Sequence, residues 1–145
     1  MLIRNLKKSD KSQFIALRKD NLKEFGYKDV AESKIEKEFR EFTNSNKKLI
    51  LIAENQGKMM GYIIATLLKN TWQKSCYIDD VFVTKNQRGR GIATALVKKL
   101  IKNCNVKEIN KFRLGVEIKN KKALSLYKKL GFALAHYEMF LDSGN

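Results

Sequence analysis

The 145-residue chain is predicted to form one α/β domain over residues 1–145. Short runs of aromatic and β-branched residues alternate along the chain with amphipathic runs of helical period. The composition is 43% hydrophobic, which is enough for one compact core. No repeat or low-complexity linker interrupts the pattern. These observations together favour helices packed around a central sheet.

The first half is expected to contain a strand, two helices and a hairpin. Apolar residues at intervals of three and four predict the helices, and the first follows Ser9, a residue type that caps helix N-termini. Residues 55–58, Asn-Gln-Gly-Lys, are typical of a tight turn between strands. The elements expected in order are a strand at 1–6, a helix from Ser9 to near Gly26, a helix at 30–42, and strands at 48–54 and 59–68.

The second half is expected to continue with strands and helices in alternation. Its clearest feature is an aromatic and β-branched strand followed directly by a glycine-containing loop and a helix. Few residues remain after the last helix, so the ending is expected either as one long strand or as a minimal hairpin around His136 and Tyr137. The elements expected in order are a strand at 77–83, a helix to about Asn103, a strand at 112–118, a helix from Asn120, and a strand at 132–141.

The loop between the strand at 77–83 and the next helix predicts a polyphosphate site. Glycine lets backbone N–H groups approach a ligand closely, and the first turn of a helix has unpaired N–H donors. The positive end of the helix dipole lies at the same place. Arg88 and Arg90 add positive charge on either side of Gly89, which suits a pyrophosphate.

The spacing of the loop excludes two common phosphate-binding motifs. A Walker A loop needs Gly-x-x-x-x-Gly-Lys-Ser/Thr, which is absent. A dinucleotide fingerprint needs a third glycine where this chain has Thr94, and it normally opens a βαβ unit. What remains is the run Arg88-Gly89-Arg90-Gly91-Ile92-Ala93.

This run matches the Gln/Arg-x-x-Gly-x-Gly/Ala motif, and the chain thereby resembles the GNAT superfamily of acyl-CoA N-acyltransferases. A second match lies about thirty residues further on. The sequence Asn120-Lys121-Lys122-Ala123-Leu124-Ser125-Leu126-Tyr127-Lys128-Lys129-Leu130-Gly131-Phe132 is similar to the family's Asn-x-x-Ala-x-x-x-Tyr-x-x-x-Gly-Phe signature. The resemblance covers residues 48–141 well and the first 45 residues only by the order of elements.

The resemblance implies a mixed, mainly antiparallel sheet with helices on both faces, and transfer of an acetyl group from acetyl-CoA to a primary amine. No metal is implied. By resemblance, Tyr127 protonates the departing thiolate, although a packing role is the alternative. Asn120 either contacts coenzyme A or only caps its helix. The residues implied in coenzyme binding are Val81, Phe82, Val83, Arg88, Gly89, Arg90, Gly91, Ile92, Ala93, Thr94, Asn120 and Tyr127.

Two adjacent carboxylates, Asp79 and Asp80, are candidates for the catalytic base. Strand alternation places them on opposite faces of the sheet, with Asp79 on the face of Val81 and Val83. A partly buried carboxylate can have a pKa high enough to accept a proton, usually through water. Asp79 is favoured; attraction of a cationic amine, or pairing with a lysine, is the alternative role for either residue. Glu117 is a further candidate.

The charge distribution suggests the acceptor. The net charge is +15, yet residues 20–41 carry seven acids and five bases, whereas residues 84–130 carry 14 bases and two acids. The basic part suits coenzyme A, and the acidic part favours a cationic amine such as a polyamine or an aminoglycoside. Acetylation of a protein lysine or N-terminus remains an alternative. A non-catalytic coenzyme sensor or RNA-binding protein is a further one, but nucleic acid is not expected because no aromatic platform accompanies the basic run.

Compartment and assembly are predicted from simpler signals. The start of the chain lacks the apolar stretch of a signal peptide, and no run of 18 apolar residues predicts a membrane span, so a cytoplasmic location is expected. Cys76 and Cys104 lack metal-ligand spacing and are expected to be reduced, structural thiols. The short C-terminal ending suggests either an open acceptor site or one completed by a second subunit, and hence a possible homodimer.

Overall fold

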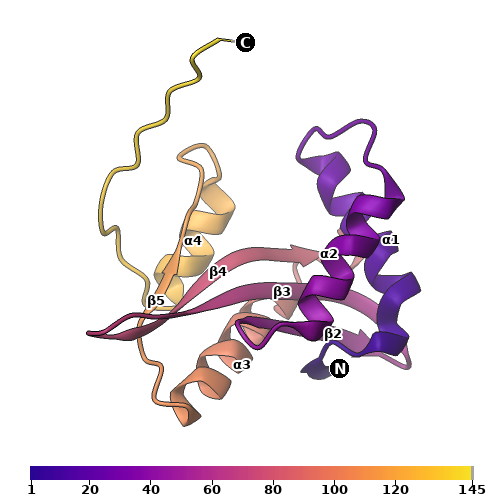
Figure 1. Ribbon diagram of the computed structural model, residues 1–145, viewed down its shortest axis with the longest axis horizontal. Coiled ribbons are helices and arrows are strands. Elements are labelled where there is room, and N and C mark those ends of the chain that lie inside the picture. The colour runs from indigo at the N-terminus through magenta and orange to yellow at the C-terminus, as the bar shows by residue number, and fades with distance from the viewer. Residues whose placement is uncertain (145) are drawn as a thin grey trace. The chain divides into compact units, whose positions relative to one another are not determined.

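The computed structural model describes residues 1–144, in two compact units, Met1–Gly115 and Val116–Asn145 (Figure 1). The first unit holds the sheet, and the second holds one helix and the C-terminal segment. Each unit is described by itself below. One domain over residues 1–145 stays a prediction.

The first unit is built on a five-stranded sheet in the order β1-β2-β3-β4-β5. The first four strands pair antiparallel and the last pairs parallel, so the predicted mixed, mainly antiparallel sheet is confirmed. Their bounds are β1 (Leu2–Asn5), β2 (Lys48–Asn55), β3 (Lys58–Lys69), β4 (Lys74–Val83) and β5 (Phe112–Leu114).

Helices cover both faces of this sheet, as predicted. Helices α1 (Lys11–Glu24) and α2 (Glu32–Asn44) pack on one face through a core that includes Phe14, Phe39 and Tyr62. Helix α3 (Ile92–Val106) packs against β2, β3 and β4. Side chains alternate across a strand, so Ile63, fully buried between Tyr62 and Ile64, faces the side of α3. Two short 3₁₀ turns, η1 (Lys8–Asp10) and η2 (Lys85–Gln87), complete the unit.

A β-bulge in β4 changes the expected positions of the two aspartates. Ile64 pairs with Asp80 and Ala65 pairs with Ile78, which leaves Asp79 as an extra residue in β4. A bulge of this kind breaks the strict alternation of side chains. The prediction that Asp79 and Asp80 lie on opposite faces is therefore wrong: Asp79 accepts a hydrogen bond from Thr66 and Asp80 lies beside Tyr62. Thr66 and Tyr62 are four residues apart on the same face of β3.

Because of the bulge, the side chains after Asp79 lie on the opposite face of the sheet from the one that strict alternation along β4 predicts. Before it, the buried Cys76 thiol lies against Cys104 of α3 and shares a hydrogen bond with it. After it, the Phe82 ring packs on the opposite face, 5.7 Å from that of Tyr62. Residues 76 and 82 would share a face in a regular strand. Both cysteines are free and buried, as expected.

The second unit contains helix α4 (Lys121–Lys129) with a well-formed cap at each end. Asn120 accepts a hydrogen bond from the backbone N–H of Ala123 at 3.1 Å, which is an N-cap contact. Gly131 adopts a φ of +94° just past the helix, and the Phe132 N–H donates to the Tyr127 carbonyl at 3.0 Å. This is the usual glycine-dependent way of ending a helix.

The strand predicted at residues 132–141 does not form, either as one strand or as a hairpin. Residues 132–144 lie outside any helix or strand (Figure 1). Most of their side chains are exposed. A strand is stabilised by a paired neighbour, and the described part of this unit holds no other strand. The strand predicted at 112–118 is also shorter, ending at Leu114. Over the described residues, no helix is long and apolar enough to cross a membrane.

Candidate functional site

The loop before α3 has the geometry of an anion site. Gly89 and Gly91 adopt φ values of +75° and +76°, which favour glycine, and a side chain built on either would meet nothing within 4 Å. The first helical bond runs from the Ala95 N–H to the Gly91 carbonyl at 3.0 Å. The N–H groups of the three residues before Ala95 therefore have no acceptor within the helix, and Gly91 has no side chain to cap them.

The residues of this loop divide into structural and open groups. Ile92, the first residue of α3, is buried and anchors the start of the helix. Ala93 and Thr94, which follow it in the first turn, are half-buried. Arg90 is exposed. Arg88 instead supports the loop from behind: its Nε donates to the Val83 carbonyl at 2.8 Å. Backbone donors and Arg90 are thus the groups most open to an anion.

Arg88 also joins the loop to the first helix. Its guanidinium forms two hydrogen bonds with the Glu24 carboxylate, at 2.9 and 2.8 Å, and lies 5.6 Å from the centre of the Phe82 ring. Half of its side chain remains exposed, so this pair is screened by water. The sequence predicted Arg88 only as a positive charge for phosphate. The structure shows that this charge already has a carboxylate partner.

The outer half of β4 has one edge beyond the sheet pairing. Pairing between β4 and β5 ends at Ile78 and Leu114, whereas β4 continues to Val83. Residues 79–83 therefore extend past the last pair on that side while β3 holds them on the other. An edge of this kind offers backbone N–H and carbonyl groups to an extended ligand. Val81, Phe82 and Val83 all lie on it, next to the loop.

Asp79, the bulged residue, is held but accessible. Its carboxylate accepts a hydrogen bond from the Thr66 hydroxyl at 2.6 Å and lies 3.5 Å from the Lys48 Nζ. One third of the side chain is exposed. The carboxylate is therefore oriented by two neighbours on the same face while water still reaches it.

Asp80 lies in a denser polar cluster with Arg18, Asn21, Glu38 and Tyr62. The Arg18 guanidinium donates to Asp80 at 2.7 Å and forms two bonds of 2.8 Å with Glu38. The Asn21 amide donates to the Tyr62 hydroxyl at 2.7 Å and also to Asp80. Arg18 thereby links both helices of this face to β4.

Burial and charge act in opposite directions on Asp80. Desolvation raises the pKa of its carboxyl above the usual value, while Arg18, Asn21 and Tyr62 favour the ionised form and reduce that shift. Burial also raises the pKa of Tyr62, and the neighbouring Asp80 charge adds to this effect. The Asp80 carboxylate is thus committed to the cluster. Asp80 is therefore better suited to holding β4 in place than to proton transfer.

Sequence reasoning missed this cluster, although one signal was present. Arg18 occurs at helical spacing with Phe14, Leu17 and Leu22, on the apolar face of its helix. A charged residue on such a face requires a buried partner, so its position predicts an acid on the elements that cover it. Nothing in the sequence identified Glu38 and Asp80 as those acids.

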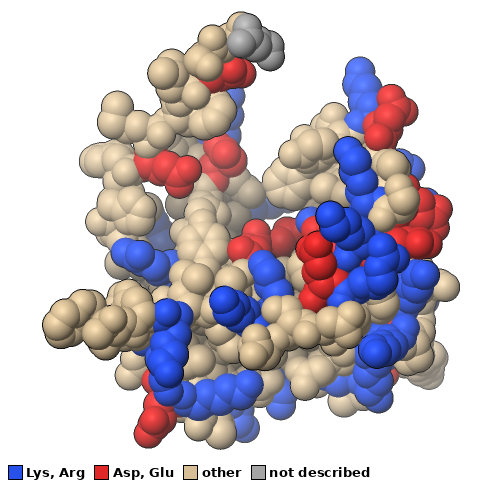
Figure 2. All heavy atoms as spheres, in the orientation of Figure 1, with Lys and Arg blue, Asp and Glu red and all other residues tan. Residues whose placement is uncertain are grey.

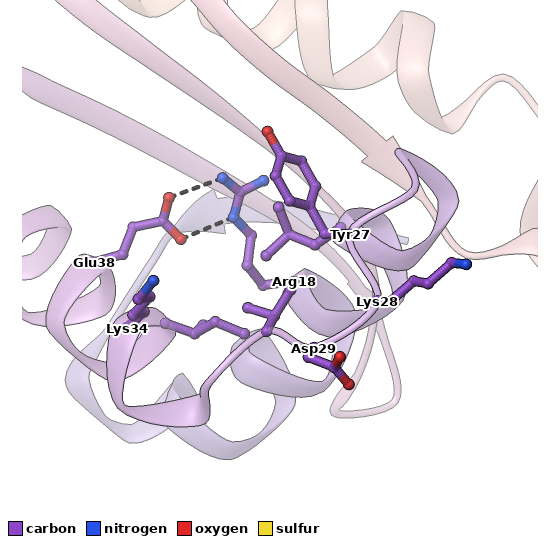
Figure 3. Close-up of a pocket in the computed structure, with 9 residues that line it drawn as sticks. Arg18, Tyr27, Lys28, Asp29, Lys34 and Glu38 are labelled. Atoms are coloured by element: carbon purple, nitrogen blue, oxygen red, sulfur yellow. Dashed lines mark hydrogen bonds and ion pairs between the residues drawn. The ribbon is translucent and has the colours of Figure 1, made fainter. Parts of the chain in front are cut away.

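A cavity of about 310 Å³ lies beside Arg18, between α1, α2 and the loop that joins them (Figure 3). The Arg18 guanidinium lies between the Glu38 carboxylate and the Tyr27 ring, while Lys28 and Asp29 extend away from it. The lining residues are Arg18, Leu22, Tyr27, Lys28, Asp29, Val30, Lys34, Ile35 and Glu38. The cavity is on the same face of the sheet as Asp79 and Asp80, and Arg18, which lines it, donates to Asp80.

The acidic segment 20–41 is less available than its composition suggested. Four of its seven acids form ion pairs within the first unit. The pairs are Glu24 with Arg88, Glu32 with Lys19, Glu36 with Lys11, and Glu38 with Arg18. Attraction of a cationic ligand therefore depends mainly on acids outside these four pairs, such as Asp79, whose contact with Lys48 is a long one of 3.5 Å.

The remaining predicted residues belong to the second unit. Tyr127 lies in α4, half-buried, with its ring packed edge-on against Phe132 at 5.6 Å. Asn120 caps the same helix. Glu117 precedes the helix, and its carbonyl accepts from the Asn120 N–H at 2.8 Å. The structural part of the second motif is therefore confirmed, and catalytic roles for these residues stay predictions. Over the described residues, no cluster of His, Cys, Asp or Glu could hold a metal ion.

Comparison with known proteins gives a consistent result. Residues 14–132 match the Acetyltransferase (GNAT) family. Thialysine N-epsilon-acetyltransferase of Mus musculus is 39% identical over 80 residues, which are 54% of this chain and 47% of the relative. The chain spans about half the length of the curated relatives it matches.

Solved structures share the fold. A protein from Clostridium acetobutylicum described as a predicted acetyltransferase, solved with acetyl-CoA, superposes with a TM-score of 0.80 at 21% identity, covering 97% of this chain and 95% of its own. The aminoglycoside antibiotic 6'-N-acetyltransferase AAC(6')-IG from Acinetobacter haemolyticus gives a TM-score of 0.80 at 14% identity, covering 100% and 99%.

Proposed function

Because this chain belongs to the GNAT acetyltransferase family, we propose that it transfers an acetyl group from acetyl-CoA to the primary amine of a small cationic molecule. The observation that carries the proposal is the sequence of three features along one stretch of chain. These are the bulged carboxylate Asp79, the open edge of β4 at residues 79–83, and the glycine loop at the start of α3.

The loop fits a pyrophosphate. Gly89 and Gly91 leave open space where any other residue would place a side chain, and the free N–H groups of the first turn of α3 lie beside them. The open edge of β4 would hold the extended arm of the coenzyme through Val81 and its neighbours. When bound, acetyl-CoA supplies the thioester whose acetyl carbon the amine attacks.

The chain's own groups would then divide the chemistry. The backbone N–H groups of the open β4 edge would polarise the acyl carbonyl. Asp79, accessible to water and oriented by Thr66, would accept the proton of the amine. Tyr127 would donate a proton to the departing sulfur. Asp80, committed to Arg18, would act as a positioning residue for β4.

The acceptor is proposed as a cationic amine on the side of α1 and α2. Asp79 and Asp80 both face that side, and the cavity beside Arg18 lies there too. Thialysine N-epsilon-acetyltransferase and the aminoglycoside acetyltransferase, which are named for amine substrates, support this class. Because most acids of residues 20–41 are paired, the proposal relies on Asp79 more than on the composition of that segment.

Isothermal titration with acetyl-CoA tests the loop. We expect micromolar binding in the parent protein and loss of about 100-fold or more in affinity for Gly91→Glu, which places a carboxylate at the phosphate site in a left-handed backbone position. Gly57→Glu is the matched control, since Gly57 has a φ of +77° in the remote β2–β3 turn with open space around it. Equal loss in both variants, or no binding by the parent, would contradict the proposal.

A thiol-release assay on the same sample then tests the acceptor. Polyamines, aminoglycosides and thialysine are compared with lysine-containing and free N-terminal peptides at matched amine concentration. Faster release with the small cationic amines supports the proposed class. Preference for the peptides would contradict it while leaving acetyl transfer intact.

A further inference from the structure

The turn between β3 and β4 presents an aromatic side chain to solvent at the end of β4 remote from the glycine loop. Trp72, the one tryptophan of the chain, is 90% exposed. The turn follows Lys69 and precedes Lys74, whereas the loop follows Val83. Nine residues of extended strand span about 30 Å, so this surface is separate from the proposed acetyl-transfer site.

The turn itself is well ordered by hydrogen bonds. The Asn70 side-chain oxygen accepts from the N–H groups of Trp72 and Gln73, both at 2.9 Å. The Asn70 N–H donates to the Gln73 carbonyl at 3.0 Å. These three hydrogen bonds fix the backbone of the turn at Trp72. The indole is therefore presented from an ordered backbone position, with its faces accessible to a flat ligand.

Positive charge gathers at the same place, and the turn residues 70–73 include no acid that would neutralise it. Lys69 and Lys74 pair directly across the two strands. Like charges in this position destabilise a hairpin, and an anion between them would relieve the repulsion. Lys111, just before β5, joins them, since its Nζ donates to the Gln73 side-chain oxygen at 2.8 Å.

These residues line one depression of the surface. It has a volume of about 450 Å³, and Lys69, Trp72, Lys74 and Lys111 all border it, with amide side chains of Asn70, Gln73 and Asn110 between them. Glu108 is the one acid among its lining residues. In Figure 2 the tip of the hairpin projects at the left, with Lys and Arg side chains on the adjoining surface at its base.

We propose that this hairpin-tip surface, formed by Lys69, Trp72, Lys74 and Lys111, binds single-stranded nucleic acid. The indole would stack on a base, the ammonium groups would contact the flanking phosphates, and the amide side chains would reach base edges. An acidic peptide would use the lysines but not the stacking face. The inference does not depend on the proposed acetyl transfer. It differs from the expectation, drawn from the sequence, that nucleic acid is not a partner.

The single tryptophan provides a direct probe. The full chain is titrated with an oligouridylate of about 12 nucleotides at low salt, and indole fluorescence is followed. Stacking of a base on Trp72 quenches that fluorescence strongly, with a saturating curve. Poly-glutamate of equal charge serves as the comparison ligand. Equal quenching by poly-glutamate, or no quenching by the oligonucleotide, overturns the proposal.

Variants then separate stacking from general charge attraction, with binding followed by anisotropy of a labelled oligouridylate. Trp72→Leu is expected to weaken binding about 10-fold or more, while Trp72→Phe retains most of it. The Lys69→Ala, Lys74→Ala double variant is expected to reduce the slope of log affinity against log salt by about 1.4, or about 0.7 per phosphate contact. Glu108→Gln is expected to tighten binding.

Lys58→Ala is the matched control for charge. Lys58 is exposed at the opposite end of β3 from Lys69, so its loss changes the net charge but not the hairpin tip. If Lys58→Ala weakens binding as much as Lys69→Ala, the attraction is a property of the whole basic chain and the site is disproved. If Trp72→Leu binds as well as the parent, stacking is disproved.

Discussion

The acids of residues 20–41 and the bases of residues 84–130 differ in how the folded chain uses them. Four of the seven acids form ion pairs with Lys or Arg of the first unit. Of the 14 bases, Arg88 pairs with Glu24, and Lys111 bonds to a neutral amide. The charge of the acidic segment is therefore largely neutralised by its pairs, of which Glu38 with Arg18 is the most buried. The basic segment retains charge for ligands, so composition alone gives a better guide to the second than to the first.

The largest effect is expected where an ion pair is most buried. Arg18→Met leaves the Glu38 and Asp80 carboxylates without their shared cation, in side chains that are 28% and 15% exposed. We expect the free energy of unfolding in urea to fall by about 3 kcal/mol. Arg40→Met, an exposed arginine of α2, should change it by less than about 0.5 kcal/mol. A loss of unfolding free energy in Arg18→Met no larger than that in Arg40→Met would contradict a stabilising role for the buried cluster.

The next effect concerns the acid that remains accessible. Asp79→Asn should lower kcat for the best amine about 100-fold, because the proposed base is lost, with the affinity for acetyl-CoA unchanged. Asp80→Asn should mainly lower the free energy of unfolding, since Asp80 holds Arg18. Its effect on kcat should be smaller than that of Asp79→Asn. Steady-state kinetics and urea unfolding on both variants give the comparison. Full activity in Asp79→Asn would remove its proposed role.

Asp10 extends the comparison to an acid outside the acidic segment. Two hydrogen bonds of 2.8 Å from the Arg4 guanidinium hold the pKa of this carboxyl below its usual value of 3.8. A lowered folded-state pKa adds stability above the unfolded pKa, and this stability is lost as the pH falls through the folded pKa. Asp10→Asn should therefore cost about 2 kcal/mol at pH 7, and the difference should narrow below pH 3.8. A difference independent of pH would contradict the assigned cause.

The smallest effect is expected at the one pair that joins the two charged segments. Glu24→Gln removes the negative partner of Arg88 beside the glycine loop. Because the pair is exposed, we expect only about a threefold gain in affinity for acetyl-CoA at low salt, which disappears at high salt. Titration at two salt concentrations measures it. A loss of affinity would show that Glu24 matters as a support for Arg88 and not as a competing charge.

Local chemistry made the loop and the helix ends predictable. Gly89 and Gly91 determine the backbone of the loop through their own conformational freedom, and Asn120 and Gly131 do the same at the ends of α4. The bulge at Asp79 was not predictable in this way. It depends on the register between β3 and β4, and alternation is the default expectation for any run of strand residues.

Long-range partners account for the other differences. Arg18 was recognisable as a charge on an apolar helix face, but its partners lie 20 and 62 residues away. The run at 132–141 has strand composition, yet strand propensity is expressed only when a neighbouring strand is available. The exposure of Trp72 follows from a hairpin tip held by Asn70, which composition does not reveal. Sequence patterns therefore located the glycine loop better than the side chains around it.

The extra residue in β4 also has a consequence for protein engineering and for the alignment of relatives. Removing Asp79 would restore a regular strand without moving any other side chain to the opposite face, because Ile78 would stay paired with Ala65 and Asp80 with Ile64. Deletion of Asp79 should thus remove its carboxylate but leave the packing of Phe82 against Tyr62 in place. In an alignment, the positions before and after Asp79 should be treated as two separate segments, since a chain without the bulge would need a one-residue gap between them.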